Sequence, residues 1–407
     1  MEEFEWLPRT LECLARQETT FQYEAYICVN QPETWWQSEE HLHVCRDNAQ
    51  LLRWLNDYQK QAAYPIHIID KSSQGKGWLG KQHGVGWARK TLFDHILGTA
   101  DAHDLVVSMD ADTEFSERYL ASVADNMVAH PQWVALSVPY YHRLTGEATA
   151  DRAILRYEIY MRSYALNMLA INSPYAFTAI GSAIVVRAEA LAKIGGITPM
   201  KSGEDFYLLQ KLRKMGEVGT WNEECVHPAA RFSDRVIFGT GPAMARGASG
   251  DWEGYPIYDW SSFAKIAETY HRIDQLYTED VDNDFIQFLK EQFKTDDLWG
   301  PLRANVTNVE QFRRRFHEKA DGLRILQFLR QEHLRESTPH HIINVDNTDQ
   351  TQIDSTKQLF KTEESGAFPA CSAFALDNMS IEELKSWRDL LFRKEMEVRR
   401  QKMDSEL

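Results

Sequence analysis

The sequence predicts an α/β protein with a Rossmann-like, mostly parallel central sheet, helices on both faces of that sheet, and a helical region after it. Two observations carry this prediction. Over residues 1–250, short apolar, β-branched runs alternate with segments whose apolar residues have helical spacing, and such alternation is typical of parallel sheets covered by helices. Beyond about residue 250, helical spacing continues but strand-like runs stop.

The expected elements follow in chain order. Strands are expected at residues 25–29, 66–69, 105–109, 133–138 and 183–186. Helices are expected at residues 42–61, 87–96, 117–129, 151–170, 206–215, 285–293 and 309–334. The predicted organisation is a main domain over residues 1–250, a helical region over 251–335, a polar linker over 336–379 and an amphipathic helix over 380–407. Ser380 and Glu383 have the spacing of a capping box for that last helix.

Composition excludes several classes of protein. A formal net charge of -15 argues against a protein that grips nucleic acid over its whole surface. The five cysteines are odd in number and scattered, which fits a reducing cytoplasm. The first residues lack the basic and apolar regions of a signal peptide, and no clean apolar run reaches the ~20 residues of a spanning helix. We therefore expect a cytoplasmic protein that meets any anionic ligand through a local basic patch.

Two carboxylates follow the third expected strand. Asp110 and Asp112 stand one residue apart, directly after the apolar run 105–109. Ligands of open α/β sheets bind beyond the carboxyl ends of the strands, and carboxylate oxygens suit Mg²⁺ or Mn²⁺ shared with substrate phosphates. The alternative is a solvated strand end that leads into the acidic first turn of the next helix.

Two other motifs place aspartates in a similar way. An EF-hand starting at Asp110 needs Gly at its sixth position and a carboxylate at its twelfth, where Phe115 and Ala121 stand, so it is excluded. A haloacid-dehalogenase type phosphatase would use Asp110 as its nucleophile. That motif expects Thr or Val where this chain has Glu114. The phosphatase stays as an alternative.

A glycine-rich segment without acidic residues lies between Asp70 and Asp94. Its positive charges are Lys71, Lys76, Lys81, Arg89 and Lys90. Glycine lets backbone N–H groups approach phosphate closely, so the segment predicts a phosphate-binding loop. A solvated loop is the alternative.

Glu204 and Asp205 head the expected helix from residue 206. A carboxylate at a helix N-terminus is kept ionised by the helix dipole and suits a general base. Ser202 and Asp205 also have capping-box spacing, which would make Asp205 a structural residue only.

Three basic or metal-ligating candidates follow. His227 is a candidate metal ligand, although a lone histidine is more often structural. Arg231 and Arg235 precede a glycine-rich stretch, and they suit either phosphate or local carboxylates.

Together these segments resemble the family 2 glycosyltransferases of the GT-A fold, over roughly residues 20–245. The matching residues are Asn30-Gln31-Pro32, Asp70, Gly84 to Lys90, Asp110-Ala111-Asp112, Gly181 to Arg187, Ile194-Gly195-Gly196, and Glu204-Asp205 with Leu208, Leu212 and Gly216. The resemblance implies inverting transfer of one sugar from a UDP- or GDP-sugar to a glycan or lipid-linked acceptor. No QxxRW sequence marks a processive synthase.

The resemblance also implies roles for individual residues. The expected donor-binding residues are Asn30, Pro32, Asp70, Lys81, Arg89, Asp110, Arg231 and Arg235. Of these, Lys81 comes from the acid-free loop. Asp112 would be the main ligand of Mn²⁺ or Mg²⁺, helped by Asp110 and His227. Gly181 and Ser182 would lie on the acceptor side, where Asp205, with Glu204 beside it, would deprotonate the acceptor hydroxyl. A non-catalytic sugar-nucleotide or glycan-binding protein is the alternative from another class.

The last helix carries basic residues beyond its apolar stripe: Arg393, Lys394, Arg399, Arg400 and Lys402. Two interpretations follow. The helix packs against its own helical region, as most amphipathic helices of globular proteins do, or it makes a peripheral contact with the inner face of a membrane.

Overall fold

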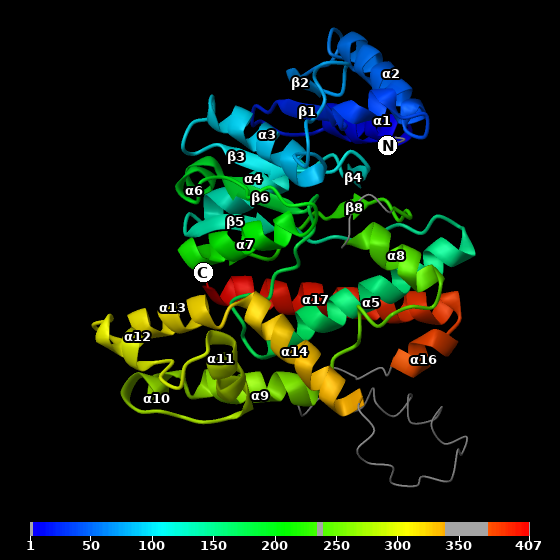
Figure 1. The fold of residues 1–407 in the computed structure, drawn as a ribbon. Helices are drawn as coiled ribbons and strands as arrows, with labels where there is room; N and C mark the ends of the chain where they lie inside the picture. The colour runs from blue at the N-terminus through cyan, green and yellow to red at the C-terminus, as the bar shows by residue number, and fades with distance from the viewer. Residues whose placement is uncertain (1–2, 234–238, 338–372, 407) are drawn as a thin grey trace. The chain divides into compact units, whose positions relative to one another are not determined.

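A computed structural model describes residues 3–233, 239–337 and 373–406 (Figure 1). The chain divides into two compact units. Unit 1 comprises Met1–Tyr157, Phe177–Asp251 and Arg399–Leu407, and unit 2 comprises Glu158–Ala176 and Trp252–Val398. Helices α5 (Ala148–Ala170) and α17 (Ile381–Glu406) each contribute residues to both units. Of the predicted linker, residues 338–372 lie outside the described residues, and its described end carries the helix α16 (Ala373–Asn378).

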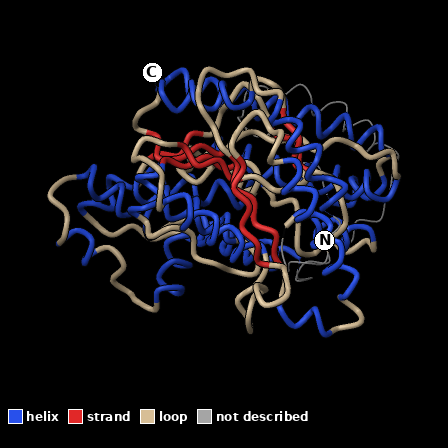
Figure 2. The backbone as a smooth tube through the Cα atoms, turned by 90° about the horizontal axis from the view of Figure 1, so that it is seen from above, coloured by secondary structure: helices blue, strands red, loops and turns tan. Residues whose placement is uncertain are grey.

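The strands of unit 1 form three small sheets, drawn in red in Figure 2. Strand β1 (Ala25–Asn30) pairs in parallel with β2 (Ile66–Lys71). A four-stranded sheet has the order β3 (Leu105–Ser108), β6 (Ile184–Arg187), β5 (Trp133–Ser137), β7 (Glu217–Gly219). Strand β4 (Thr113–Phe115) pairs antiparallel with β8 (Val226–Pro228).

The mixed α/β class is therefore confirmed, but the prediction of a mostly parallel sheet is wrong for the described strands. Three of their five pairs are antiparallel, namely β3–β6, β4–β8 and β5–β6. Strand β6 lies between β3 and β5, and its residues Ile184 to Val186 are at most 1% exposed. A strand buried on both faces is continuously apolar whichever way it runs, so its sequence could not reveal its direction.

Helices fill the connections of unit 1. They are α1 (Glu3–Ala15), α2 (Leu42–Tyr58), α3 (Val85–Leu97), α4 (Tyr119–Ala129), α6 (Ala188–Lys193), α7 (Glu204–Met215), α8 (Thr240–Ala248) and the 3-10 helix η1 (Glu33–Gln37). Helix α1 was not predicted, although Leu7 and Leu11 have helical spacing. These leucines pack with Leu51 and Leu55 of α2 and Val29 of β1 in one core cluster. This core fixes α1 against the β1–β2 sheet, which carries Asn30 and Asp70, two of the predicted nucleotide-side residues.

Unit 2 is helical in its described part. After residue 251 it contains α9 (Trp260–His271), α10 (Ile273–Thr278), α11 (Asp284–Phe293), α12 (Gly300–Ala304), α13 (Val309–Lys319), α14 (Gly322–Ser337) and α16 (Ala373–Asn378). The helical segment predicted at 309–334 is two helices, divided after Lys319. The core of unit 2 is aromatic here. The ring of Phe328 is centred 5.0 Å from that of Phe285 and 5.4 Å from that of Phe288.

The C-terminal helix begins with the predicted capping box. The Glu383 carboxylate accepts from Ser380 N at 2.8 Å, and Ser380 Oγ accepts from Glu383 N at 3.2 Å. Within unit 2, α17 packs on α5, because Leu384 and Leu391 are buried and two ion pairs join the helices. The helix therefore packs within its own chain, on α5, which the prediction placed in the main domain.

The two ion pairs between α5 and α17 are buried. Arg388 donates to Glu158 at 2.8 Å, and Arg162 donates to Glu395 at 2.8 Å. All four side chains are at most 3% exposed. Among the described residues, no helix has the length and apolar character needed to cross a membrane.

Candidate active site

Arg89 is the central side chain of the candidate site. It lies in the second turn of α3 and is only 8% exposed. Its Nη1 donates to Glu204 Oε1 at the start of α7, and its Nη2 donates to Asp110 Oδ1 after β3. The two carboxylates raise the pKa of Arg89 above its ordinary value, although burial acts in the opposite direction. The guanidinium therefore joins two predicted site residues that are far apart in the sequence.

Gly181 makes room for this guanidinium. A Cβ atom at position 181 would overlap the Arg89 side chain. The Gly181 carbonyl accepts a hydrogen bond from Ser108 Oγ at 2.7 Å, which ties the glycine to β3. The neighbouring Ser182 is fully buried, and its Oγ has no hydrogen-bond partner among the described residues. The predicted acceptor-side segment thus lies against Arg89.

Asp205 is partly buried beside this bridge. Burial and then the neighbouring Glu204 carboxylate raise its pKa from 3.8 to about 6, while Arg89 and the hydrogen bond from Phe206 N to Oδ1 (2.7 Å) lower it. The capping-box interpretation of Asp205 is wrong. Helix α7 begins at Glu204, and its N-cap is Gly203 with a φ of 78° and no side-chain cap.

Asp112 takes part in a second ion-pair cluster. Arg231 Nε donates to Asp112 Oδ2 at 2.6 Å, and Arg231 Nη2 donates to the two Glu3 oxygens at 2.8 and 3.0 Å. Burial and the nearby Asp110 raise the pKa of Asp112, and Arg231 lowers it. Glu3, on α1, was not predicted. It is 228 positions from Arg231, and no local pattern in the sequence marks such a pair.

His227 lies on β8 opposite Glu114 of β4, in antiparallel register. Its Nδ1 is 2.7 Å from the carbonyl oxygen of Tyr141, to which the neutral ring donates, and burial lowers its pKa. Within residues 3–233, 239–337 and 373–406, no three His, Cys, Asp or Glu side chains are grouped to hold a metal. Among these residues His227 is therefore not grouped with Asp110 and Asp112, and the register of β4 with β8 pairs it with Glu114.

The two aspartates nevertheless fit a divalent cation bound together with a diphosphate. Mg²⁺ is usually held by one or two carboxylates and completed by substrate phosphates and water. Asp112 is partly buried near two other acids, Asp110 and Glu3, and its burial and this crowding disfavour its charge. A cation at this place would offset that unfavourable charge.

The predicted nucleotide side is formed at the ends of β1 and β2. Asp70 Oδ1 accepts from the backbone N of Ser72 (3.0 Å) and Ser73 (2.9 Å). Burial alone would raise the pKa of Asp70, but the hydrogen bonds from Ser73 and Ser72 outweigh it and lower the pKa to about 2. Lys76 Nζ lies 3.1 Å from Asp70 Oδ2. Asp70 therefore orders the start of the acid-free loop.

Trp78 connects the same loop to the end of β1. Its Nε1 donates to Asn30 Oδ1 at 3.3 Å, and its backbone bridges to Pro32. Lys81, three residues on, is exposed. Arg235, the last predicted donor-binding residue, lies outside the described residues.

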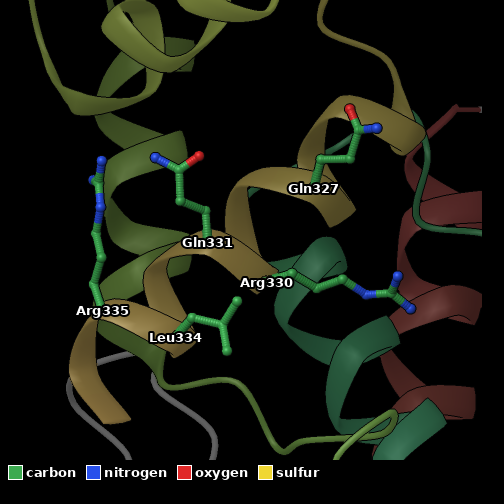
Figure 3. A pocket seen from close by; sticks show the side chains of 5 residues that line it. All are labelled: Gln327, Arg330, Gln331, Leu334 and Arg335. Atoms are coloured by element: carbon green, nitrogen blue, oxygen red, sulfur yellow. The ribbon is translucent and has the colours of Figure 1, made fainter. Parts of the chain in front are cut away.

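A separate hollow lies on α14 of unit 2 (Figure 3). It is lined by Gln327, Arg330, Gln331, Leu334 and Arg335 and has a volume of about 510 Å³. None of the predicted site residues lines it.

The candidate site is described from the contacts of its own residues, because no protein-family model matches the chain, and no curated protein matches it significantly.

Proposed function

We propose that the chain is a metal-dependent glycosyltransferase with a GT-A-type donor domain in residues 1–250. It would transfer one sugar from a UDP- or GDP-sugar to an acceptor hydroxyl, with inversion. The observation that carries the proposal is the double ion pair of Arg89. One guanidinium contacts both Asp110, on the candidate donor side, and Glu204, the neighbour of the candidate base Asp205.

Asp205 has the proton affinity that this role requires. With a pKa of about 6 it is ionised at neutral pH and more basic than an ordinary aspartate. It would accept the proton of the acceptor hydroxyl as the hydroxyl oxygen attacks the anomeric carbon. Glu204 is held by Arg89, so its role would be to fix the start of α7.

The donor side would be formed by Asp112 and Asp110. These carboxylates would hold Mn²⁺ or Mg²⁺, which when bound neutralises charge on the departing nucleoside diphosphate. Asp70 would act through the loop that it orders, since its carboxylate already accepts hydrogen bonds from Ser72 and Ser73. Asn30 and Pro32 would border the nucleotide, and Lys81 would meet phosphate.

We further propose a cytoplasmic location and a glycan or lipid-linked acceptor in cell-envelope or glycan synthesis, with no nucleic-acid partner. Peripheral contact with a membrane would use the exposed basic residues of α17, such as Arg393. Arg399 takes no part in that surface, since it is 4% exposed.

The proposal is tested by calorimetric binding of UDP and GDP with Mn²⁺. Asp112→Ala should abolish metal-dependent binding, while Asp125→Ala, at an exposed position on α4, should leave it unchanged. Unchanged binding by Asp112→Ala would overturn the proposal. Asp205→Asn should retain donor binding and lose transfer.

Two alternatives give different results in the same samples. The phosphatase alternative requires Asp110 as nucleophile, and beryllium fluoride would then form a stable adduct. A non-catalytic binding protein would bind nucleotide sugars without hydrolysing or transferring them.

A further inference from the structure

The Glu3–Arg231–Asp112 cluster raises a question about charge. Arg231 bridges two carboxylates, with Nε on Asp112 and Nη2 on both oxygens of Glu3. The three side chains are partly buried, with exposed fractions of 14% for Asp112, 17% for Glu3 and 20% for Arg231. A cation that approaches Asp112 must therefore compete with the Arg231 guanidinium.

Glu3 changes the outcome of that competition. If Asp112 were the sole partner of Arg231, its loss to a metal would leave a partly buried guanidinium unpaired, which is costly. The paired contact of Nη2 with Glu3 does not involve Asp112. Arg231 would therefore keep its ion pair with Glu3 when Asp112 binds a metal cation.

Helix α1 is fixed firmly enough for this role. Leu7 and Leu11 are buried in the core cluster with α2, and Thr10 Oγ1 donates to the carbonyl of Ala111 at 2.9 Å. Ala111 is the residue between the two aspartates. Helix α1 also packs against β4, which follows Asp112 (Figure 1).

We propose that Glu3 is a positioning residue that holds Arg231 while Asp112 is transferred from Arg231 to a divalent cation. This inference rests on the proposed function, because it takes Asp112 as a metal ligand. The released guanidinium would stay on Glu3 and would be available to the diphosphate of a donor. Helix α1 thereby sets the metal affinity of the site.

The test is calorimetric titration of the full chain with Mn²⁺ alone at pH 8. Glu3→Gln should weaken Mn²⁺ binding about tenfold, the size of one charge-assisted interaction. Arg231→Met removes the competing cation and should tighten Mn²⁺ binding by at least about fivefold, while weakening the binding of UDP with Mn²⁺. A loss of folding cannot produce these opposite signs, and thermal unfolding of each variant verifies that it is folded.

Three further variants separate this role from general charge effects. Glu5→Gln removes the same charge from the same helix at an exposed position, where Glu5 pairs only loosely with Arg9 at 3.8 Å, and should change affinity less than about twofold. Arg231→Lys keeps the competing charge and should not tighten binding. In Arg231→Met, where Glu3 acts on the cation through its own charge alone, adding Glu3→Gln should weaken Mn²⁺ binding less than it does in the wild type.

The outcomes distinguish this inference from the proposed function. Wild-type protein that binds no Mn²⁺, with or without UDP, would overturn both. Wild-type binding combined with unchanged or weakened binding by Arg231→Met would overturn the inference alone. An equal loss from Glu3→Gln with and without Arg231 would also overturn it.

Discussion

We expect the ionised Asp205 side chain to destabilise the folded protein. Its pKa rises from 3.8 to about 6 on folding, a shift of about 2 units, and each unit corresponds to about 1.4 kcal/mol. A raised folded pKa means that folding favours the protonated acid. The stabilisation is fully present below pH 3.8 and is lost as the pH rises through about 6.

Replacing Asp205 with Asn removes this penalty. Asp205→Asn should therefore be more stable than the wild type at pH 8, by about 2 to 3 kcal/mol. The gain should shrink between pH 7 and pH 4 and vanish near pH 4. The same variant should have no transfer activity, so stability and activity would change in opposite directions.

Urea unfolding between pH 4 and pH 8, followed by tryptophan fluorescence, measures the difference. Asp125→Asn is the matched control, because Asp125 is exposed on α4, and its stability difference should not vary with pH. An Asp205→Asn variant that is less stable than the wild type at pH 8 would contradict this prediction. So would a gain that is constant over the whole range.

Two other buried ion-pair sites give predictions for urea unfolding. Arg89→Met should lower the free energy of unfolding by about 3 kcal/mol, because Glu204 stays buried without its cation. Adding Glu204→Gln should recover part of that loss. A larger loss in the double variant would contradict the Arg89 bridge. Arg388→Met should lower the free energy of unfolding by about 3 kcal/mol, because the buried Glu158 carboxylate loses its ion pair at 2.8 Å and keeps the longer one to Arg162 at 3.5 Å. Lys385→Met, at an exposed pair of the same helix, should cost under about 1 kcal/mol, and equal losses from the two α17 variants would contradict the buried pairing.

Local patterns predicted the longer strands and helices, but not the short strands β4, β7 and β8 or the helices α1, α6, α8, α9, α10 and α12. The helical spacing of Leu51, Leu52 and Leu55 marked α2, and the spacing of Ser380 and Glu383 marked the start of α17, because both depend on residues within one or two turns. Strand direction depends on how the chain returns to the sheet. The sequence therefore predicted where strand β6 lies, but not that it runs antiparallel to β3 and β5.

The candidate site was most directly predictable where a side chain follows an element boundary. Asp110 at the end of β3 and Glu204 at the start of α7 are such residues, and the structure joins both through Arg89. Glu3 carries no local signal, since its partner Arg231 is distant in the sequence. His227 had a suitable side chain, but its strand register, which depends on tertiary structure, places it opposite Glu114.

The buried pairs between α5 and α17 also have a consequence for synthesis of the chain. Glu158 and Arg388 are 230 positions apart. At ribosomal rates of 5–20 residues per second, the first waits about 10 to 50 seconds for the second. During that time Glu158 and Arg162 of α5 lack Arg388 and Glu395, their partners on α17. We therefore expect the nascent chain to be more prone to aggregation until α17 is available to pack.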